Sequence, residues 1–286
     1  MNENSIDCIF VIDESGFLGY AKNQEKFPGE FGLVAGYFLP FSTVEKAKEA
    51  AKPFFAEFRK NDDDKIHITD LSRDEQNRLR NKVFEIFECN DLSWLYNAIS
   101  VQGMYEFYKN DDSPKKEKIH TKLFYSIILK ALAFIKTEIE TVRKVNMLIV
   151  SDKLNKGEVK DFEREIKNNH YLLTTRQKEE IYKKKNLETD KIETFIFTTT
   201  VTMPESDNFQ FDEDELNLDI CTDISDVTLI ADVLANSAFY YLTQKINDNP
   251  NIRLNSKEAI EMHPLAHKVW GNQAEDPLDE MFRRKR

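Results

Sequence analysis

The sequence predicts an α/β protein in which a mixed β-sheet is flanked by helices and a helical insertion follows the second strand. Two short apolar runs, CIFVID at 8–13 and VNMLIVSD at 145–152, each end in an aspartate and are typical of buried strands. The stretch that joins the first two strands is short and carries glycine and proline, which indicates an antiparallel pair. Helical and extended patterns then alternate in the second half of the chain. This order predicts a mixed sheet covered by helices.

The second and third strands are expected at 31–40 and 92–101, on either side of a helical segment at 42–90. Within that segment Ser72 is followed by Glu75, which is the spacing of a capping box at the start of an amphipathic helix. The segment separates two strands that would otherwise follow one another. We therefore interpret it as an insertion.

The second half of the chain continues the alternation. We expect a long helix at about 115–140, the buried strand at 145–152, a charged helix or helix pair at 157–185, a fifth strand at 192–202, an acidic loop around 212–215 and a last helix at 225–244. As domains, residues 1–250 are expected to form the α/β domain, with the insertion inside it, and residues 251–286 a C-terminal extension.

Composition narrows the class of protein. Hydrophobic residues make up 41% of the 286 residues, which is enough for one large core. No apolar run approaches the ~18 residues that span a bilayer, and no basic region precedes the first apolar run, so we expect a cytoplasmic protein without membrane contact. The three cysteines follow no disulfide or zinc spacing. A formal net charge of −11 argues against a broad basic surface, so any contact with nucleic acid has to be local.

Three aspartates are the candidate functional residues. Asp13 and Asp152 end buried strands, where a rigid sheet can aim side chains at a common point, and Asp232 lies in the apolar helical run TLIADVLANSA. A charge in such a helix is costly unless a Lys or Arg partner or a metal ion compensates it. Three carboxylates that converge to about 4 Å repel by roughly 4 kcal/mol per pair at an effective dielectric of about 20. A cluster of this kind predicts bound Mg²⁺ or Mn²⁺, the cations that favour oxygen ligands.

Several motifs together resemble a known family. These are Asp13-Glu14-Ser15-Gly16, His67 in KIHITDL, Asp152 after its strand, and the late LIADVLAN run. The pattern is similar to that of the family of unknown function number 3800, whose members resemble ribonuclease H-like nucleases. The resemblance implies a ribonuclease H-like fold and phosphodiester hydrolysis with two Mg²⁺ or Mn²⁺ ions. In that scheme Asp13 bridges the ions, and Asp152 and Asp232 hold one each.

Two further residues are candidate catalytic groups. Glu14 points away from Asp13 on a regular strand, so it joins the site only if Ser15-Gly16 turns the chain; otherwise it is a solvated or lysine-paired acid. The resemblance implies that His67 orients water or contacts the scissile phosphate, and the alternative is a structural histidine.

Two functions follow as hypotheses. The first is a metal-dependent nuclease that acts on nucleic acid, with a bacterial defence, antiviral or toxin role implied by the resemblance, and with or without a partner subunit. The second is a non-catalytic ribonuclease H-like module that binds a protein partner or nucleic acid. A metal titration followed by thermal melting separates the two, because a ligand that binds the folded state stabilises it.

Overall fold

The computed structural model describes residues 5–59, 65–109, 117–139, 142–152, 154–185, 192–201, 211–212, 215–223, 225–249 and 256–271. For 170–180, 182–185, 192–201 and residue 212, the description covers the backbone alone.

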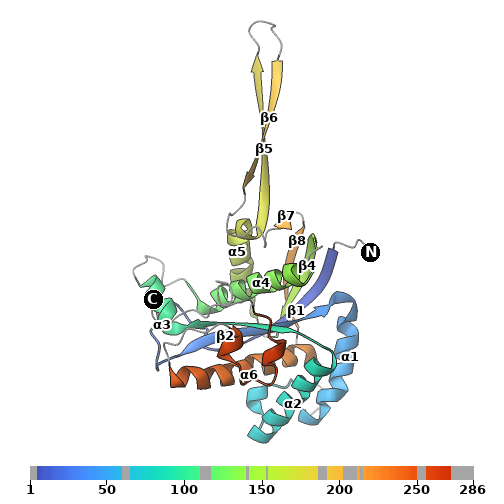
Figure 1. Cartoon of the computed structure of the whole chain (residues 1–286), viewed down its shortest axis with the longest axis vertical. Helices are drawn as coiled ribbons and strands as arrows, with labels where there is room; N and C mark the ends of the chain where they lie inside the picture. The colour runs from blue at the N-terminus through green and yellow to red at the C-terminus, as the bar shows by residue number, and fades with distance from the viewer. Residues whose placement is uncertain are drawn as a thin grey trace.

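A five-stranded mixed sheet forms the centre of the protein, in the order β3-β2-β1-β4-β8 (Figure 1). Its strands are β1 (Ser5–Gly16), β2 (Phe31–Pro40), β3 (Trp94–Ser100), β4 (Lys144–Ser151) and β8 (Leu216–Thr222). β2 pairs antiparallel with both β1 and β3, whereas β4 runs parallel to both β1 and β8. The α/β class and the mixed sheet predicted from the sequence are confirmed.

Helices cover both faces of this sheet. They are α1 (Val44–Phe55), α2 (Arg73–Cys89), α4 (Ile119–Glu138), α5 (Lys156–Leu173) and α6 (Asp226–Asp248). Side chains alternate along β1, so that Ile9 and Val11 join a core with α1, α2 and α6, while Phe10 and Ile12 join a core with α4 and α5. Odd-numbered and even-numbered residues at the end of β1 therefore face different helices.

The insertion packs into the same core as the sheet. Its buried side chains Phe55, Leu79 and Phe87 belong to the hydrophobic cluster that α6 also enters. The predicted capping box is present at the start of α2, because Ser72 N–H donates to Glu75 Oε2 at 2.9 Å and Glu75 N–H donates to Ser72 Oγ at 3.4 Å. Short 3-10 turns, η2 (Ala56–Phe58) and η3 (Ile68–Asp70), connect α1 to α2.

The described part of the C-terminal region also joins this core. α7 (Ser256–Ala259) and the turn η4 (Ala266–Lys268) follow α6. Leu265 and Val269 are buried, and the indole N–H of Trp94 donates to the carbonyl of Leu265 at 3.1 Å. Residues 256–271 are thus packed against β3 and α6, while the remainder of the region assigned to an extension lies outside the described residues.

The fifth strand of the sheet differs from the one expected. It is β8, whereas 192–202 contributes β6 (Ile192–Val201), which pairs antiparallel with β5 (Thr174–Lys185) in a separate sheet with β7 (Phe211–Asp212). The segment expected to be a helix or helix pair at 157–185 divides into α5 and β5. Figure 1 shows the β5–β6 ribbon projecting from the body. Because β5 and β6 pair with each other along their length, their backbone groups need no partner strand in the central sheet.

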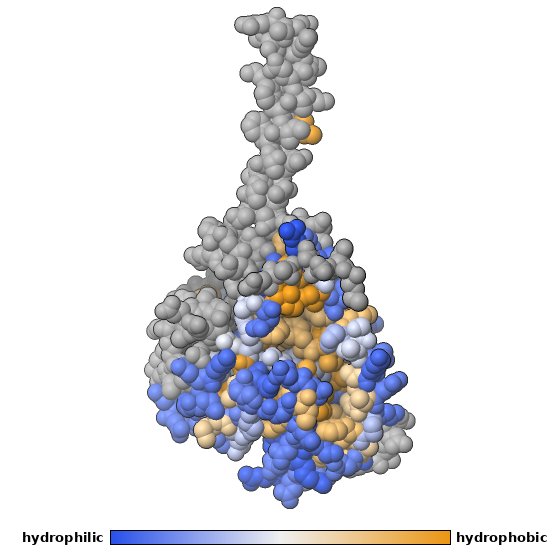
Figure 2. Space-filling view, turned by 45° about the vertical axis from the view of Figure 1, so that its right-hand side comes forward, coloured by the Kyte–Doolittle hydropathy of each residue, from blue (hydrophilic) through white to orange (hydrophobic). Residues whose placement is uncertain are grey.

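The body presents a mixed surface. Figure 2 shows apolar residues in a band below the ribbon, bordered by hydrophilic residues. Within the described part of the chain, no helix has the length and apolar character needed to cross a membrane.

Candidate active site at the strand ends

Parallel pairing brings two of the predicted aspartates to one edge of the sheet. Val11 of β1 pairs with Val150 of β4, so Asp13 and Asp152 both stand two residues beyond the same pair. Asp13 and Asp152 are both buried. By the alternation along each strand, both lie on the face that α6 covers.

The third aspartate reaches this edge from α6. Asp232 has a side chain that is 14% exposed, and its Oδ2 accepts a hydrogen bond from the backbone N–H of Ile68 at 3.0 Å. Ile68 itself is fully buried in the core beneath the insertion. This apolar anchor fixes the segment that precedes η3 against α6. We call Asp13, Asp152 and Asp232 the acidic cluster.

Two basic side chains from the insertion face the acidic cluster. Lys65 Nζ lies 2.5 Å from Asp152 Oδ2, which forms an ion pair. His67 Nδ1 lies 3.9 Å from Asp152 Oδ2 and 3.7 Å from Asp232 Oδ2. His67 therefore lies beside the cluster, as expected, and not in the core of the insertion. Asp70, the last residue of η3, is exposed.

Asp13 carries the clearest electrostatic signal. Its pKa is raised well above the usual value, first because burial removes the carboxylate from water and then because Glu14, Asp232 and Asp152 repel its negative charge. No described residue forms an ion pair with Asp13. The buried acid therefore sits among like charges.

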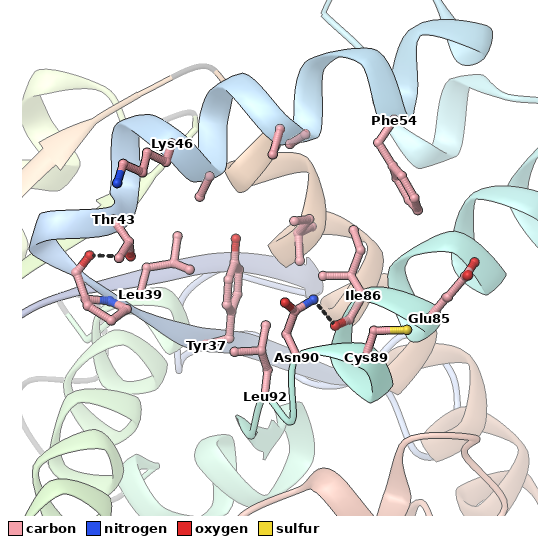
Figure 3. A pocket seen from close by; sticks show the side chains of 15 residues that line it. Tyr37, Leu39, Thr43, Lys46, Phe54, Glu85, Ile86, Cys89, Asn90 and Leu92 are labelled. Carbon is pink, nitrogen blue, oxygen red and sulfur yellow. Dashed lines mark hydrogen bonds between the residues drawn. The ribbon is translucent and has the colours of Figure 1, made fainter.

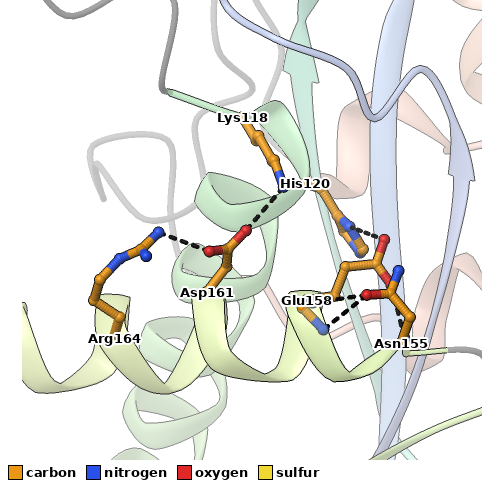
Figure 4. Close-up of polar contacts among 7 residues, drawn as sticks. Lys118, His120, Asn155, Glu158, Asp161 and Arg164 are labelled. Atoms are coloured by element: carbon orange, nitrogen blue, oxygen red, sulfur yellow. Dashed lines mark hydrogen bonds and ion pairs between the residues drawn. The ribbon is translucent and has the colours of Figure 1, made fainter.

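Glu14 points to the opposite face of the sheet, among residues of α4 and α5. Strand β1 continues through Gly16, so the expected turn at Ser15-Gly16 does not bring Glu14 to the Asp13 side. Glu14 Oε1 lies 3.8 Å from His120 Nε2. On the other side of the ring, His120 Nδ1 lies 3.8 Å from Glu158 Oε1 (Figure 4). Burial lowers the pKa of His120 despite the attraction of Glu158. Neither His120 nor Glu158 was predicted, since nothing in the sequence links these positions.

By chemistry, the acidic cluster fits a hard divalent cation. Its donors are carboxylate oxygens, the ligands that Mg²⁺ and Mn²⁺ favour. By spacing, no three His, Cys, Asp or Glu side chains in the described ranges are grouped closely enough to hold a metal ion. The observed compensation of Asp152 comes instead from the ammonium of Lys65.

His263 and His267, four residues apart, have structural surroundings. His263 is buried, its Nε2 is 2.9 Å from Ser237 Oγ, and its Nδ1 accepts from Leu265 N–H at 3.0 Å. Burial lowers the pKa of His263 to about 3. His267 pairs with Glu88 at 3.0 Å on the surface.

His263 should make the protein acid-sensitive. The unfolded chain binds a proton at a pKa of about 6.5, whereas folded His263 resists protonation down to about pH 3. The contribution of neutral His263 to the free energy of unfolding is therefore fully present above pH 6.5. It is lost as the pH falls through this window, by roughly 1.4 kcal/mol per pH unit. Urea unfolding at pH 7 and pH 5 should show the loss, and His263→Gln should reduce the slope. An unchanged slope in the variant would assign the acid sensitivity to other groups.

An apolar pocket lies away from the acidic cluster. It has a volume of about 680 Å³ and lies between α1, α2 and the end of β2, with Tyr37, Leu39, Phe54, Ile86 and Leu92 among its lining residues (Figure 3). None of the three clustered aspartates lines this cavity. It is therefore not part of the candidate active site.

Comparison with known proteins adds no relative. No protein family model matches the sequence, and no curated protein is significantly similar to it. The resemblance to the family of unknown function number 3800 accordingly stays a prediction.

Proposed function

We propose that this protein is a ribonuclease H-like, Mg²⁺- or Mn²⁺-dependent nuclease whose acidic cluster acts on phosphodiester bonds. The observation that supports the proposal best is the buried Asp13 carboxylate, which is surrounded by like charges and forms no ion pair with a described residue. A structural acid is normally paired or exposed. A site that collects anions at the ends of two parallel strands has a physical reason if it serves to bind a cation.

Each residue has a definite task in this proposal. Asp13, Asp152 and Asp232 would hold the metal, which would supply Lewis acidity and lower the pKa of water. Ile68 N–H donates to Oδ2 of Asp232 and so helps to fix this carboxylate at the cluster. His67, at 3.7–3.9 Å from two carboxylates, is placed to position water or a phosphate oxygen beside them. Glu14 faces His120 on the other side of the sheet. Its negative charge acts on the site by repelling that of Asp13, which raises the pKa of Asp13.

The proposed substrate is nucleic acid, bound locally. The net charge of −11 opposes binding over the whole surface, so the contact has to be confined to the neighbourhood of bound cations and of basic side chains such as Lys65. A role in bacterial antiviral defence or as a toxin, with or without a partner subunit, is proposed from the family resemblance alone.

A metal titration tests this proposal directly. We expect millimolar Mn²⁺ or Mg²⁺ to raise the melting temperature of the purified chain above its value in EDTA, because binding to the folded state stabilises it by about 2.7 kcal/mol at a hundredfold excess over Kd. Cleavage of fluorescent single- and double-stranded DNA and RNA should depend on the same ions. Absence of both the melting shift and cleavage would exclude the metal-dependent nuclease.

The second candidate is a non-catalytic module that binds a protein or nucleic acid. The observation that favours it is the pairing of Asp152 with Lys65, together with the lack of a ready metal-binding group in the part of the chain that is described. In that case Asp152 is an internally compensated structural acid. Nucleic-acid binding by mobility shift that is unaffected by EDTA, without cleavage, would favour this module.

A further inference from the structure

We propose that Lys65 competes with the divalent cation for Asp152, so that its ammonium stabilises the metal-free site and sets the affinity for metal. This inference rests on the proposed function, since it concerns the same acidic cluster. It assigns to Lys65 a positioning role beyond the candidate ligands themselves.

The ammonium of Lys65 already occupies an oxygen of Asp152 that a cation would use. Lys65 Nζ lies 2.5 Å from Asp152 Oδ2, in close charge-assisted contact. An ammonium bonded to that oxygen uses one of its lone pairs. Its positive charge would also repel a divalent ion bound to the same carboxylate. Binding of the ion at Asp152 is therefore favoured when Lys65 leaves.

The two partners differ in exposure and in the backbone that carries them. Asp152 follows a central strand, and its side chain is 5% exposed, whereas the Lys65 side chain is 25% exposed and begins in a segment with no helix or strand. A lysine ammonium sits on a flexible four-carbon stem and is readily hydrated. Lys65 can therefore move into solvent while Asp152 stays in place.

The anchoring of the segment makes this exchange local. Ile68 is fully buried, and its N–H is bonded to Asp232, so the backbone three residues after Lys65 is fixed to α6. His67 Nδ1 lies within 4 Å of both Asp152 Oδ2 (3.9 Å) and Asp232 Oδ2 (3.7 Å). Withdrawal of the ammonium therefore does not require the insertion to detach. It removes one positive charge from the cluster at the moment a divalent ion enters.

The test is the Mn²⁺ affinity of the full chain, measured by isothermal titration calorimetry and by melting with and without EDTA. We expect Lys65→Met to bind Mn²⁺ roughly tenfold or more tightly than wild type, since the competing charge is gone, and to melt lower in EDTA, since Asp152 loses its partner. Lys65→Arg should keep the pair and bind no more tightly than wild type. Lys118→Met is the matched control, because Lys118 pairs with Asp161 at 2.8 Å and is similarly exposed, yet lies outside the cluster.

Each result has one meaning. If wild type binds Mn²⁺ and Lys65→Met binds with equal or lower affinity, Lys65 is not a competitor, while the proposed nuclease stands. If neither wild type, Lys65→Met nor Lys65→Gln binds Mn²⁺, the metal site and this inference fail together. Binding by Lys65→Met alone would support competition most strongly. Should Lys65→Met not fold, as judged by circular dichroism, Lys65→Gln takes its place in the same comparison.

Discussion

Replacement of Asp13 by asparagine is expected to raise the stability of the metal-free protein and to abolish metal-dependent hydrolysis. Asparagine keeps the shape of the side chain and removes a buried charge that Glu14, Asp152 and Asp232 repel. We expect a gain of roughly 1–3 kcal/mol at pH 7, since changes of this size are usual when one buried charge cost is removed. Hydrolysis should fall by roughly a thousandfold, the scale on which loss of one key electrostatic group acts.

The pH dependence identifies the cause of this gain. The pKa of folded Asp13 is raised above its unfolded value of about 3.9, so the folded state binds the proton more tightly. The cost of keeping Asp13 folded is absent below that value and grows as the pH rises towards the folded pKa. The difference between Asp13→Asn and wild type should therefore vanish near pH 3.5 and be largest at neutral pH.

Thermal melts in EDTA at both pH values measure this effect, at about 2–4 °C per kcal/mol for a chain of this size. Asp219→Asn, an exposed carboxylate on β8, is the control and should leave the melting temperature unchanged. Asp152→Asn should raise the melting temperature less than Asp13→Asn, because it relieves repulsion of Asp13 but also removes the ion pair with Lys65. A destabilised Asp13→Asn protein in EDTA at pH 7 would show that an unseen interaction, rather than repulsion, dominates at this position.

The sequence was sufficient to predict the elements that place the acidic cluster. The stretches 8–12 and 147–150, just before Asp13 and Asp152, consist of apolar residues, because both strands are covered on both faces. α6 is apolar on most sides, because it packs on both β1 and β2. Burial of this kind is visible in the local pattern of apolar residues. The strands and the helix that carry these three acids could therefore be predicted from the sequence pattern.

The edge of the sheet could not be predicted in the same way. β8, LNLDICT, has a single buried residue, Leu216, and directly follows the acidic stretch at 212–215, so the sequence did not distinguish it from the expected loop. β5, TTRQKEEIYKKK, is rich in residues that favour helices, but it is extended because it pairs with β6 and β7. Tertiary partners decided both elements.

The partners of the cluster were also out of reach of the sequence. Lys65 in KIHITDL flanks His67, but nothing in that motif specifies Asp152 as its partner. Glu14 and His120 likewise meet only because β1 and α4 are packed side by side. Contacts between residues so far apart along the chain depend on the three-dimensional fold.

Replacement of Arg59 by methionine is expected to cause the largest loss of stability among single changes near the insertion. Arg59 follows η2, and its guanidinium is paired with Asp226, the first residue of α6. The two side chains are 12% and 8% exposed, so the pair is nearly removed from water. Burial raises the pKa of Asp226 even though the charge and hydrogen bond of Arg59 oppose that rise. Removing the cation leaves a buried acid without its main compensation.

We expect Arg59→Met to lose roughly 3 kcal/mol in urea unfolding, near the lower end of the usual cost of breaking a buried pair. The N-terminus of α6 still favours a negative charge at Asp226, which keeps the loss at that lower end. The double variant Arg59→Met with Asp226→Asn should recover most of the stability, because neither charge is then left alone. The four proteins form a double-mutant cycle, and a coupling energy well below 1 kcal/mol would contradict the pair's role. Since Arg59 joins the segment that carries Lys65 and His67 to the helix that carries Asp232, the single variant should also show a smaller melting shift with Mn²⁺, and the double variant should restore that shift.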